Sequence, residues 1–366
     1  MRHDQLHHRR SAWRRVLRSR WLHPLNDVGA IEQLLVQVHP ALAFNQIRAR
    51  VVAVIRETGN ATSFVLRPNR RFPLFHAGQH LLLNHEIDGV SEQRCYTLST
   101  RPRADRTITI TVKTQTSGRV SSRLHDDLKI GTTVRIGGIA GEFVLPDTLP
   151  QRILLLSAGS GITPMRALLE ELHARAYTGD VVLAHSCRGE HDLIFGAELR
   201  ALAARWPSLR LIIHDSAQSG RLDHAMLASQ LGDFTQWSTW ACGPAPLLEW
   251  ITAAFRVAGR EAELHIERFA AHLPATADDG SADATVHCTV SKQVFTATAN
   301  APLLIAAENA GLQPKYGCRR GICRSCVCRK RSGSVRNLVT GEVSAQADQW
   351  IQLCISSAQS NLDLEL

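Results

Sequence analysis

The sequence contains no long hydrophobic run: no stretch approaches the roughly 20 uninterrupted apolar residues that a membrane-spanning helix requires. Its basic start, residues 1–21, also lacks the apolar core and the small-residue cleavage site of a secretory signal peptide. These two absences argue against a membrane-embedded or exported protein. We therefore expect a cytoplasmic protein.

The composition is that of a globular protein, with 44% hydrophobic and 20% charged residues. A chain of 366 residues is too long for one compact core and fits two or three domains. The formal net charge is +9, but no nucleic-acid recognition motif accompanies it. We therefore do not expect a nucleic-acid partner.

The basic residues concentrate in two places. Near the N-terminus they flank Trp13, Leu17 and Trp21, which follow helical spacing. This segment is either an amphipathic helix on an anionic membrane surface or a docked helix with a solvated basic face. The second concentration surrounds a group of cysteines and consists of Arg319, Arg320, Arg324, Arg329, Lys330 and Arg331.

The order of strand and helix signals predicts a multidomain protein. Short β-branched runs separated by turn residues predict an antiparallel β-barrel over residues 47–150. Over residues 151–269, buried strands alternate with helical segments, which predicts an α/β domain with a parallel sheet. Residues 270–284 read as a linker and residues 1–46 as a basic, helical leader. The final domain spans residues 285–366.

Four of the nine cysteines crowd into residues 318–328. Cys318, Cys323 and Cys326 have C-x4-C-x2-C spacing, and Cys354 follows on a predicted final strand, WIQLCISS. This is the spacing of a plant-type [2Fe–2S] site, in which a distant strand supplies the fourth thiolate. A four-cysteine zinc site usually has two C-x2-4-C pairs, and the second pair is missing here.

Cys328 would share a strand face with Cys326, but the spacing favours Cys326 as the ligand. Residues 285–366 resemble the plant-type ferredoxin domain, which implies a β-grasp fold and one-electron transfer. Free ferredoxins are typically acidic, whereas this loop is rich in arginine. The arginines indicate either an acceptor with an acidic face or solvated side chains near the cluster's own charge. Three further cysteines are interpreted as small buried residues: Cys95, Cys187 and Cys288.

Two motifs in the predicted barrel suit a flavin. Alternation along a strand puts Arg94 and Tyr96 on one face, where a guanidinium binds phosphate and an aromatic ring lies beside the flavin. Gly118, Ser121 and Ser122 open a helical segment that forms either a phosphate cradle or a plain serine cap. Each motif alone is weak, and their order strengthens the prediction.

Two motifs in the predicted α/β domain suit a dinucleotide. Gly159 and Gly161 follow a buried strand, and we expect Thr163 to cap the next helix with Pro164 as its first residue. Cys242 ends another predicted strand, where it either approaches a nicotinamide or belongs to a simple turn.

Together these motifs resemble the ferredoxin–NADP reductase superfamily, and with the cysteine loop they resemble its members with a C-terminal ferredoxin domain. The resemblance covers residues 47–366 and implies hydride transfer from a pyridine nucleotide to a flavin, followed by single-electron transfer through the cluster. It implies a flavin site formed by Arg94, Cys95, Tyr96, Thr97, Val112, Lys113, Gly118, Val120, Ser121 and Ser122. It implies a nucleotide site formed by Gly159, Ser160, Gly161, Thr163, Pro164, Gly243 and Pro244, with Cys242 at the nicotinamide and Phe269 stacked on the flavin.

The same resemblance bears on cofactor choice. Ser186 and Arg188 follow the second strand of the α/β domain, where the family places residues for the 2′-phosphate of NADPH, and Arg221 is a further candidate. We expect NADPH rather than NADH, and FAD rather than FMN.

The electron acceptor is not encoded in the chain. The segment that leads into the barrel, residues 25–58, looks similar to that of bacterial reductases that serve membrane-bound acyl desaturases. We expect a membrane-bound di-iron desaturase as the acceptor, with peripheral membrane contact through the basic N-terminus. The alternatives are a Rieske-type or other soluble oxygenase and, in a different class, a non-enzymatic [2Fe–2S] redox sensor.

Overall fold

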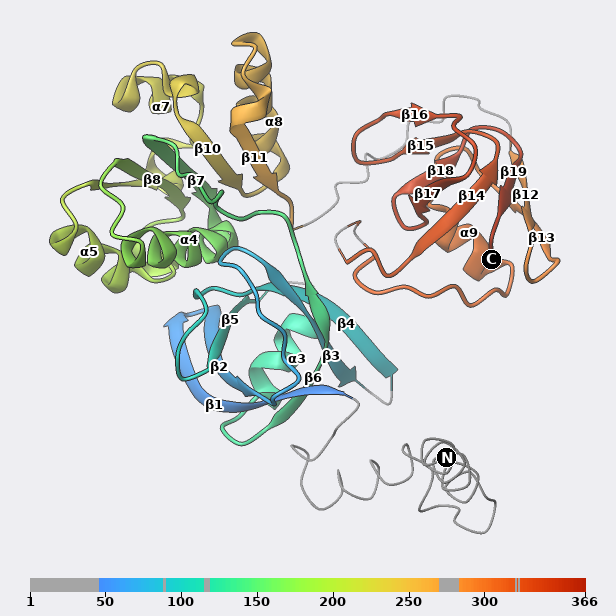
Figure 1. The fold of residues 1–366 in the computed structure, drawn as a ribbon, viewed down its shortest axis with the longest axis horizontal. Helices are drawn as coiled ribbons and strands as arrows, with labels where there is room; N and C mark the ends of the chain where they lie inside the picture. Colours follow the sequence, from blue (N-terminus) through green and yellow to red (C-terminus); the bar gives the residue numbers. More distant parts are fainter. Residues whose placement is uncertain (1–45, 88–89, 115–118, 270–282, 320, 322) are drawn as a thin grey trace, which may run out of the picture.

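The computed structural model describes residues 46–87, 90–114, 119–269, 283–319, 321 and 323–366. The basic N-terminal segment, most of the predicted linker, Gly118 and Arg320 lie outside these residues. Within them, no helix is long and apolar enough to cross a lipid bilayer. The described residues form a barrel, a parallel-sheet domain and a third, mixed-sheet domain (Figure 1).

Six antiparallel strands form the barrel, in the order β4-β3-β6-β1-β2-β5. A bridge between Leu98 and Ile110 joins the end of β4 to β5 and closes the sheet. Helix α3 (Arg119–Asp127) adds Val120 and Leu124 to the apolar core inside. The strands are β1 (Ile47–Thr58), β2 (Ala61–Pro68), β3 (His80–Ile87), β4 (Val90–Thr97), β5 (Ile108–Lys113) and β6 (Thr133–Ala140).

The second domain has a five-stranded parallel sheet in the order β11-β10-β7-β8-β9. Successive strand residues face opposite sides: Leu155 packs with α4 and α5, and Leu154 packs with α7 and α8. Helices α4 and α5 lie on one face of the sheet, and α7 and α8 lie on the other (Figure 1). The strands are β7 (Arg152–Ala158), β8 (Asp180–Cys187), β9 (Leu209–Asp215), β10 (Ser238–Cys242) and β11 (Leu264–Glu267). The helices are α4 (Ile162–Ala174), α5 (Gly196–Arg205), α6 (Ser216–Ser219), α7 (His224–Leu231) and α8 (Ala245–Val257).

The third domain has a mixed five-stranded sheet, in the order β13-β12-β19-β14-β17, and a small sheet, β16-β15-β18. Helix α9 (Leu303–Asn309) packs its buried leucines into the core between them. The strands are β12 (Ala284–Cys288), β13 (Val294–Ala297), β14 (Val327–Ser332), β15 (Val335–Asn337), β16 (Val343–Ser344), β17 (Gln349–Gln352), β18 (Ser356–Ala358) and β19 (Leu362–Leu364). The multidomain fold expected from the sequence is confirmed.

One expected strand is wrong. WIQLCISS is not a single strand, because β17 ends at Gln352 and β18 begins at Ser356 in the other sheet. The backbone N–H of Ile355 donates to the carbonyl oxygen of Gln352 and turns the chain between them. Cys354 therefore lies in a turn, which directs it toward the cysteine loop.

Candidate functional site

The carboxyl ends of β7 and β10 are neighbours at the centre of the parallel sheet. The chain order reverses here, since β8 and β9 extend the sheet beyond β7 and β11 extends it beyond β10. Open α/β sheets bind their ligands at such a point. The glycine turn Gly159–Gly161 follows β7 and Cys242 ends β10, so the two dinucleotide motifs meet.

The two glycines of this turn are required for different reasons. Gly159 has a φ of +56°, a backbone conformation that side chains disfavour. Gly161 packs against the end of β10, where an added Cβ would lie 2.1 Å from the carbonyl oxygen of Cys242. The turn therefore keeps its backbone open to a ligand and close to β10.

The expected helix cap at Thr163 is wrong. Helix α4 begins at Ile162 with Gly161 at its N-cap position, and the hydroxyl of Thr163 donates to the carbonyl oxygen of Ser160 at 3.0 Å. Pro164 is consequently not the first helical residue. The glycine turn is itself a 3-10 turn that continues directly into α4, so the helix starts before Thr163.

Buried polar groups from two domains gather beside this turn. The strand registers set Cys242 beside Glu267 and His80 beside Thr97. Nδ1 of His80 lies 3.4 Å from Oε1 of Glu267 and links the barrel to the parallel sheet. Within the described part of the chain, Thr97 Oγ1, His80 Nε2 and Glu267 Oε2 are buried without a hydrogen-bond partner. Such atoms suit a polar ligand bound between the domains.

The pKa of Glu267 predicts a pH-dependent stability. Burial raises this pKa, and the nearby His80 opposes the shift only in part. The folded chain then binds this proton more readily than the unfolded chain, so the stabilisation is complete below the ordinary glutamate pKa of about 4.3 and is lost as the pH rises through the raised pKa. From about pH 5 to about pH 8, the melting temperature of the wild type should fall relative to that of Glu267→Gln. Calorimetry giving a constant difference would contradict this.

The predicted flavin residues of β4 lie in different environments. Arg94 and Tyr96 are half-buried, with Tyr96 packed against the barrel core, and Thr97 is buried. Val112 and Val120 lie inside that core, so only their backbone atoms are open to a ligand outside the barrel. The predicted flavin residues are therefore not equally accessible: on β4, Arg94 and Tyr96 are partly open to a ligand, and Thr97 is buried.

Helix α3 begins where the sequence predicts a phosphate cradle. Ser121 and Ser122 lie in its first turn, with Ser121 half-buried and Ser122 exposed. Helix N-termini present free backbone N–H groups that favour anions. Gly118, which completes the predicted cradle, lies outside the described residues.

Lys113 contacts the nucleotide domain. Its Nζ lies 2.6 Å from Oδ1 of Asp192, and Nε of Arg188 lies 3.3 Å from Oδ2 of the same carboxylate. Although burial opposes it, hydrogen bonds from the two cations lower the pKa of Asp192. Asp192 therefore joins the barrel to the loop after β8. Arg188 remains mainly solvent-exposed, Ser186 is buried beside it, and Arg221 is exposed.

The four motif cysteines form two pairs. Backbone N–H groups of Cys318 and Cys323 lie 3.1 and 3.3 Å from each other's Sγ atoms. A side-chain hydrogen bond joins Cys326 to Cys354, and the N–H of Gly321 lies 3.2 Å from the Sγ of Cys354. Four thiols in two pairs fit a cluster of two irons, with two thiolates on each iron. In the described residues, no group of three His, Cys, Asp or Glu suits a single metal ion.

Cys328 lies close in sequence but in a different environment. It is buried on β14, and this burial raises the pKa of Cys328 to about 12. Its Sγ lies 3.7 Å from the carbonyl oxygen of Arg329, whereas the side chain of Cys326 is hydrogen-bonded to that of Cys354. This pairing with another motif cysteine favours Cys326 over Cys328 as a cluster ligand.

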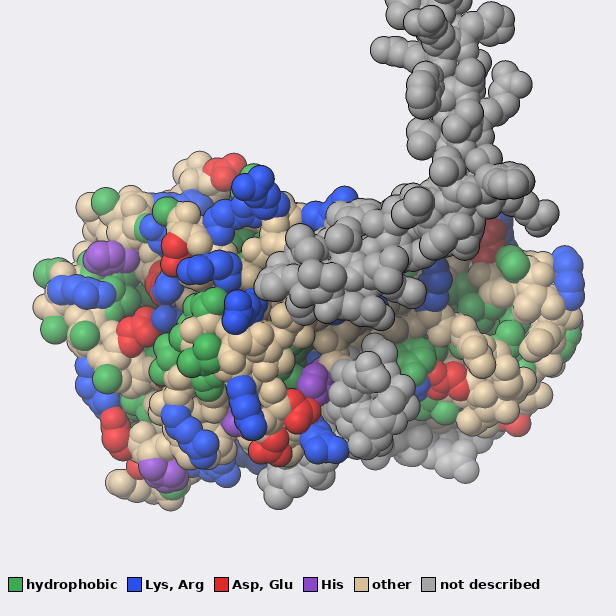
Figure 2. Space-filling model, turned by 90° about the horizontal axis from the view of Figure 1, so that it is seen from below, with side chains coloured by type: hydrophobic (Ala, Val, Ile, Leu, Met, Phe, Trp, Pro, Cys, Tyr) green, Lys and Arg blue, Asp and Glu red, His purple; other side chains and the backbone are tan. Residues whose placement is uncertain are grey.

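The basic residues near the cysteines are mostly paired with acids. Arg319 makes two bonds of 2.7 Å to Glu308, and Arg329 and Arg331 both contact Asp348. Lys330 is wholly buried and donates to two backbone carbonyl oxygens at 2.6 Å, so it is no part of a basic surface. Among the described arginines of this group, only Arg324 makes no ion pair with an acid; it is exposed. On the face in Figure 2, basic side chains are interspersed with acidic ones.

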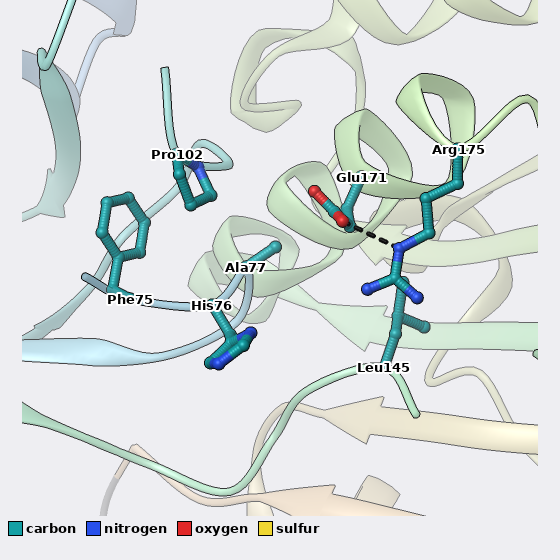
Figure 3. Close-up of a pocket in the computed structure, with 7 residues that line it drawn as sticks. All are labelled: Phe75, His76, Ala77, Pro102, Leu145, Glu171 and Arg175. Carbon is teal, nitrogen blue, oxygen red and sulfur yellow. Dashed lines mark hydrogen bonds and ion pairs between the residues drawn. The ribbon is translucent and has the colours of Figure 1, made fainter. Parts of the chain in front are cut away.

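A small cleft elsewhere at the domain boundary contains none of the predicted site residues. Phe75, His76 and Pro102 reach it from the barrel, opposite Glu171 of α4 and Arg175, which directly follows this helix (Figure 3). Arg175 Nε donates to Glu171 at 2.8 Å across its edge. This cleft is therefore separate from the β4 and β10 ends.

Three family models match successive parts of the chain: an oxidoreductase FAD-binding domain over residues 49–145, an oxidoreductase NAD-binding domain over 155–252 and a 2Fe-2S iron-sulfur cluster binding domain over 286–359. An NADPH oxidoreductase of Mycobacterium tuberculosis is 37% identical over 332 residues, which cover 90% of this chain and 86% of that protein. The chain belongs to the ferredoxin reductase superfamily. Its branch carries a C-terminal [2Fe–2S] domain.

This ferredoxin reductase is similar to further relatives. The ferredoxin reductase component of 3-ketosteroid-9-alpha-monooxygenase from Mycolicibacterium smegmatis is 32% identical over 80% of this chain and 88% of its own length. The solved structure of phthalate dioxygenase reductase matches 87% of this chain and 97% of its own, with a TM-score of 0.61 and 23% identity. At that identity the structure supports the shared fold alone.

The ferredoxin reductase is an electron-transfer oxidoreductase that uses FAD, NAD(P)H and a [2Fe–2S] cluster. The expected FAD and cluster are thereby confirmed. The unpaired polar atoms near the end of β4 and the two thiol pairs fit these groups chemically. The sequence analysis gave no role to His80 or Asp192. The only signal for either residue was a polar side chain next to an apolar segment.

Proposed function

We propose that this ferredoxin reductase oxidises NADPH and delivers single electrons to a membrane-bound di-iron desaturase. Electron transfer is supported chiefly by the four cysteines, which lie together in two pairs. The same chain also contains a flavin domain and a nucleotide domain. When bound, FAD accepts two electrons as hydride and releases them singly, and a [2Fe–2S] cluster accepts one at a time.

The chain's own residues position these groups. Arg94 binds the flavin phosphate, Tyr96 lies against the flavin, and the unpaired hydroxyl of Thr97 donates to it. Ser121 and Ser122 present the N-terminus of α3 to phosphate. Phe269 covers the flavin until the nicotinamide arrives, which is supported by its packing beside the core that contains Cys242.

The nucleotide is held by the turn after β7. Gly159, Ser160 and Gly161 bring backbone N–H groups to the pyrophosphate, with Thr163 and Pro164 stiffening the start of α4. Gly243 and Pro244 follow Cys242 and shape the nicotinamide edge. Burial raises the pKa of Cys242 well above its ordinary value, so it acts there as a neutral thiol.

The cluster ligands in this proposal are Cys318, Cys323, Cys326 and Cys354. Backbone N–H groups that point at the sulfurs of Cys318, Cys323 and Cys354 support it, because such donors stabilise thiolates.

NADPH preference rests on Arg188, helped by Ser186 and Arg221. Its guanidinium is exposed and anchored at one edge by Asp192, which leaves donors for a 2′-phosphate. The similarity of this chain to a relative named NADPH oxidoreductase supports the preference for NADPH. The specific observation in favour of NADH is Asp215, an acidic residue at the end of β9, near Gly189.

Arg188→Ala should raise the KM for NADPH about tenfold or more, with little effect on the KM for NADH, because only NADPH has the 2′-phosphate. Steady-state kinetics with both nucleotides on a one-electron dye would measure this. Arg200→Ala is a matched control, since Arg200 pairs with Glu190 at 2.6 Å on the same domain. An equal change in both KM values would contradict the assigned role.

A desaturase acceptor is supported by the leader's similarity to desaturase reductases and by the basic, tryptophan-containing N-terminus. We also propose a cytoplasmic protein with peripheral membrane contact. The competing acceptor is a soluble oxygenase, which the names of several relatives favour, among them the reductase subunit of a glycine betaine monooxygenase from Chromohalobacter salexigens. That subunit is 29% identical over 86% of this chain and 94% of its own length.

Deleting residues 1–22 tests the acceptor. Desaturation supported by membranes that contain the desaturase should fall about tenfold or more, while dye reduction by NADPH should stay unchanged, because only the first reaction needs membrane contact. The control replaces the arginines of this segment by lysine, which keeps its charge. Equal loss of both activities would contradict the membrane-docking role.

A further inference from the structure

Strand β4 presents alternate side chains to two different neighbours. Side chains alternate along a strand, so Gln93 and Cys95 share one face and Arg94 and Tyr96 share the other. Tyr96 packs against the barrel core. Cys95 lies directly opposite Leu82 of β3 in the strand register. The residues that follow one another in this strand therefore belong to two surfaces of the barrel.

The second surface contacts the cysteine loop of the ferredoxin domain. Leu82 and Cys95 pack with Cys318 and Cys323 in one small apolar group that contains residues of both domains. The side chains of Cys95 and Cys318 are joined by a hydrogen bond. The cysteine nearest the flavin motif thus contacts the first pair of cluster cysteines rather than the barrel core.

Gln93 fixes the approach of the loop. Its Nε2 donates to Asn84 at 2.8 Å, which directs Oε1 toward the loop, where Ser325 Oγ donates to it at 3.5 Å. A Cβ built on Gly317 would lie 2.3 Å from that Oε1. A side chain at position 317 would have to displace Gln93, Cys323 or Ser325, so glycine suits this close approach of the loop to β4. Gln93 on β4 and Gly317 in the cysteine loop therefore both help to hold the loop against Cys95.

We propose that Cys95 is a positioning residue that couples the flavin domain to the cluster, its thiol donating a hydrogen bond to the sulfur of Cys318. This inference rests on the proposed function, in which β4 holds the flavin and Cys318 is a cluster ligand. Once Cys318 is an iron-bound thiolate, the thiol of Cys95 carries the only proton of the pair and must be the donor.

Such a donor favours the reduced cluster. Reduction adds one electron from the flavin to the cluster, breaks no bond and makes the cluster more negative by one charge. Hydrogen bonds to the sulfurs are among the features that set the potential of such clusters, and a donor stabilises the more negative state. Removing it shifts the internal electron transfer back toward the flavin.

The test compares Cys95→Ala, which removes the donor, with Cys95→Ser, which keeps a hydroxyl donor. Cys288→Ala is the matched control. Cys288 is buried in the ferredoxin core together with Cys326 and Cys354, but it lies outside the group that contacts β4. Each purified full-length protein is titrated anaerobically, and the cluster midpoint potential is read from its visible and electron paramagnetic resonance signals. The rate of cluster bleaching after mixing with NADPH is followed separately from that of the flavin.

In Cys95→Ala, the equilibrium constant for electron transfer from flavin to cluster should fall about tenfold, which is about 59 mV for a one-electron couple. Cys95→Ser should lie within about threefold of the wild type, and Cys288→Ala should match it. Equal cluster potentials in Cys95→Ala and the wild type would overturn the inference. A wild-type protein without cluster absorbance would instead overturn the proposed function, before any variant is compared.

Discussion

Cys326→Ala should lose its [2Fe–2S] absorbance and reduce cytochrome c at least about a hundredfold more slowly, since replacing even an outer-shell partner of a metal ligand costs 10–100-fold. One iron would keep a single thiolate, because Cys326 is hydrogen-bonded to Cys354 in the second thiol pair. NADPH-driven reduction of ferricyanide, which accepts electrons directly from the flavin, should stay near the wild-type rate. Visible spectra, iron content and the two assays would measure this.

Cys328→Ala provides the control, because it makes the same chemical change two residues along the chain. Cys328 packs in the ferredoxin core, so its replacement should cost about 1 kcal/mol of stability and leave the cluster in place. A Cys326→Ala protein that kept its full cluster absorbance would contradict the assignment and identify Cys328 as a substitute ligand.

Apart from Cys354, the distant fourth thiolate that the plant-type pattern implies, the parts of the site that the sequence predicted are local. The C-x4-C-x2-C run and the glycine turn each lie within about a dozen residues, where spacing alone constrains the geometry. The barrel strands β1 and β2 were also predictable, because two β-branched runs flank Gly59 and Asn60 in a tight hairpin. In each case the determining interactions lie between neighbours in the chain.

The parts that sequence reasoning missed depend on distant segments. The contact of His80 with Glu267 and the ion pair of Lys113 with Asp192 each join the barrel to the parallel sheet. No periodicity marks such a pair: His80 and Asp192 each read alone as an ordinary polar residue, and the sequence assigned Lys113 to the flavin rather than to an acidic partner. Lys330 shows the same limit: its charge predicts exposure, yet two backbone carbonyls hold it in the core.

The alternation of side chains along β4 was predicted correctly, but it did not reveal which residues Cys95 contacts. The sequence placed it both in the flavin motif and among the buried small residues. The side chain lies on the opposite face of β4 from Tyr96, where only the fold of the last domain supplies its neighbours. Contacts between domains that are joined by a long linker cannot be derived from the pattern of either domain alone.

Gly161→Ala should slow flavin reduction by NADPH about a hundredfold, because a shift of about 1 Å in a reacting pair is enough for such a loss. The added methyl would lie 2.1 Å from the carbonyl oxygen of Cys242 and 2.6 Å from its carbonyl carbon. Both contacts are with backbone, so no flexible side chain can move aside. The glycine turn after β7 and the end of β10 must therefore separate, and in the proposed function these two segments hold the nucleotide and its nicotinamide.

Stopped-flow reduction by NADPH, compared with reduction by dithionite, would separate this effect from general damage, because dithionite needs no nucleotide site. Gly59→Ala is the matched control, since the same methyl added in the hairpin between β1 and β2 meets no atom within 4 Å. Overpacking at Gly161 should also cost about 1–3 kcal/mol of stability, which thermal unfolding would detect. If Gly161→Ala were reduced by NADPH as fast as Gly59→Ala, the close packing of the turn against β10 would have no part in hydride transfer.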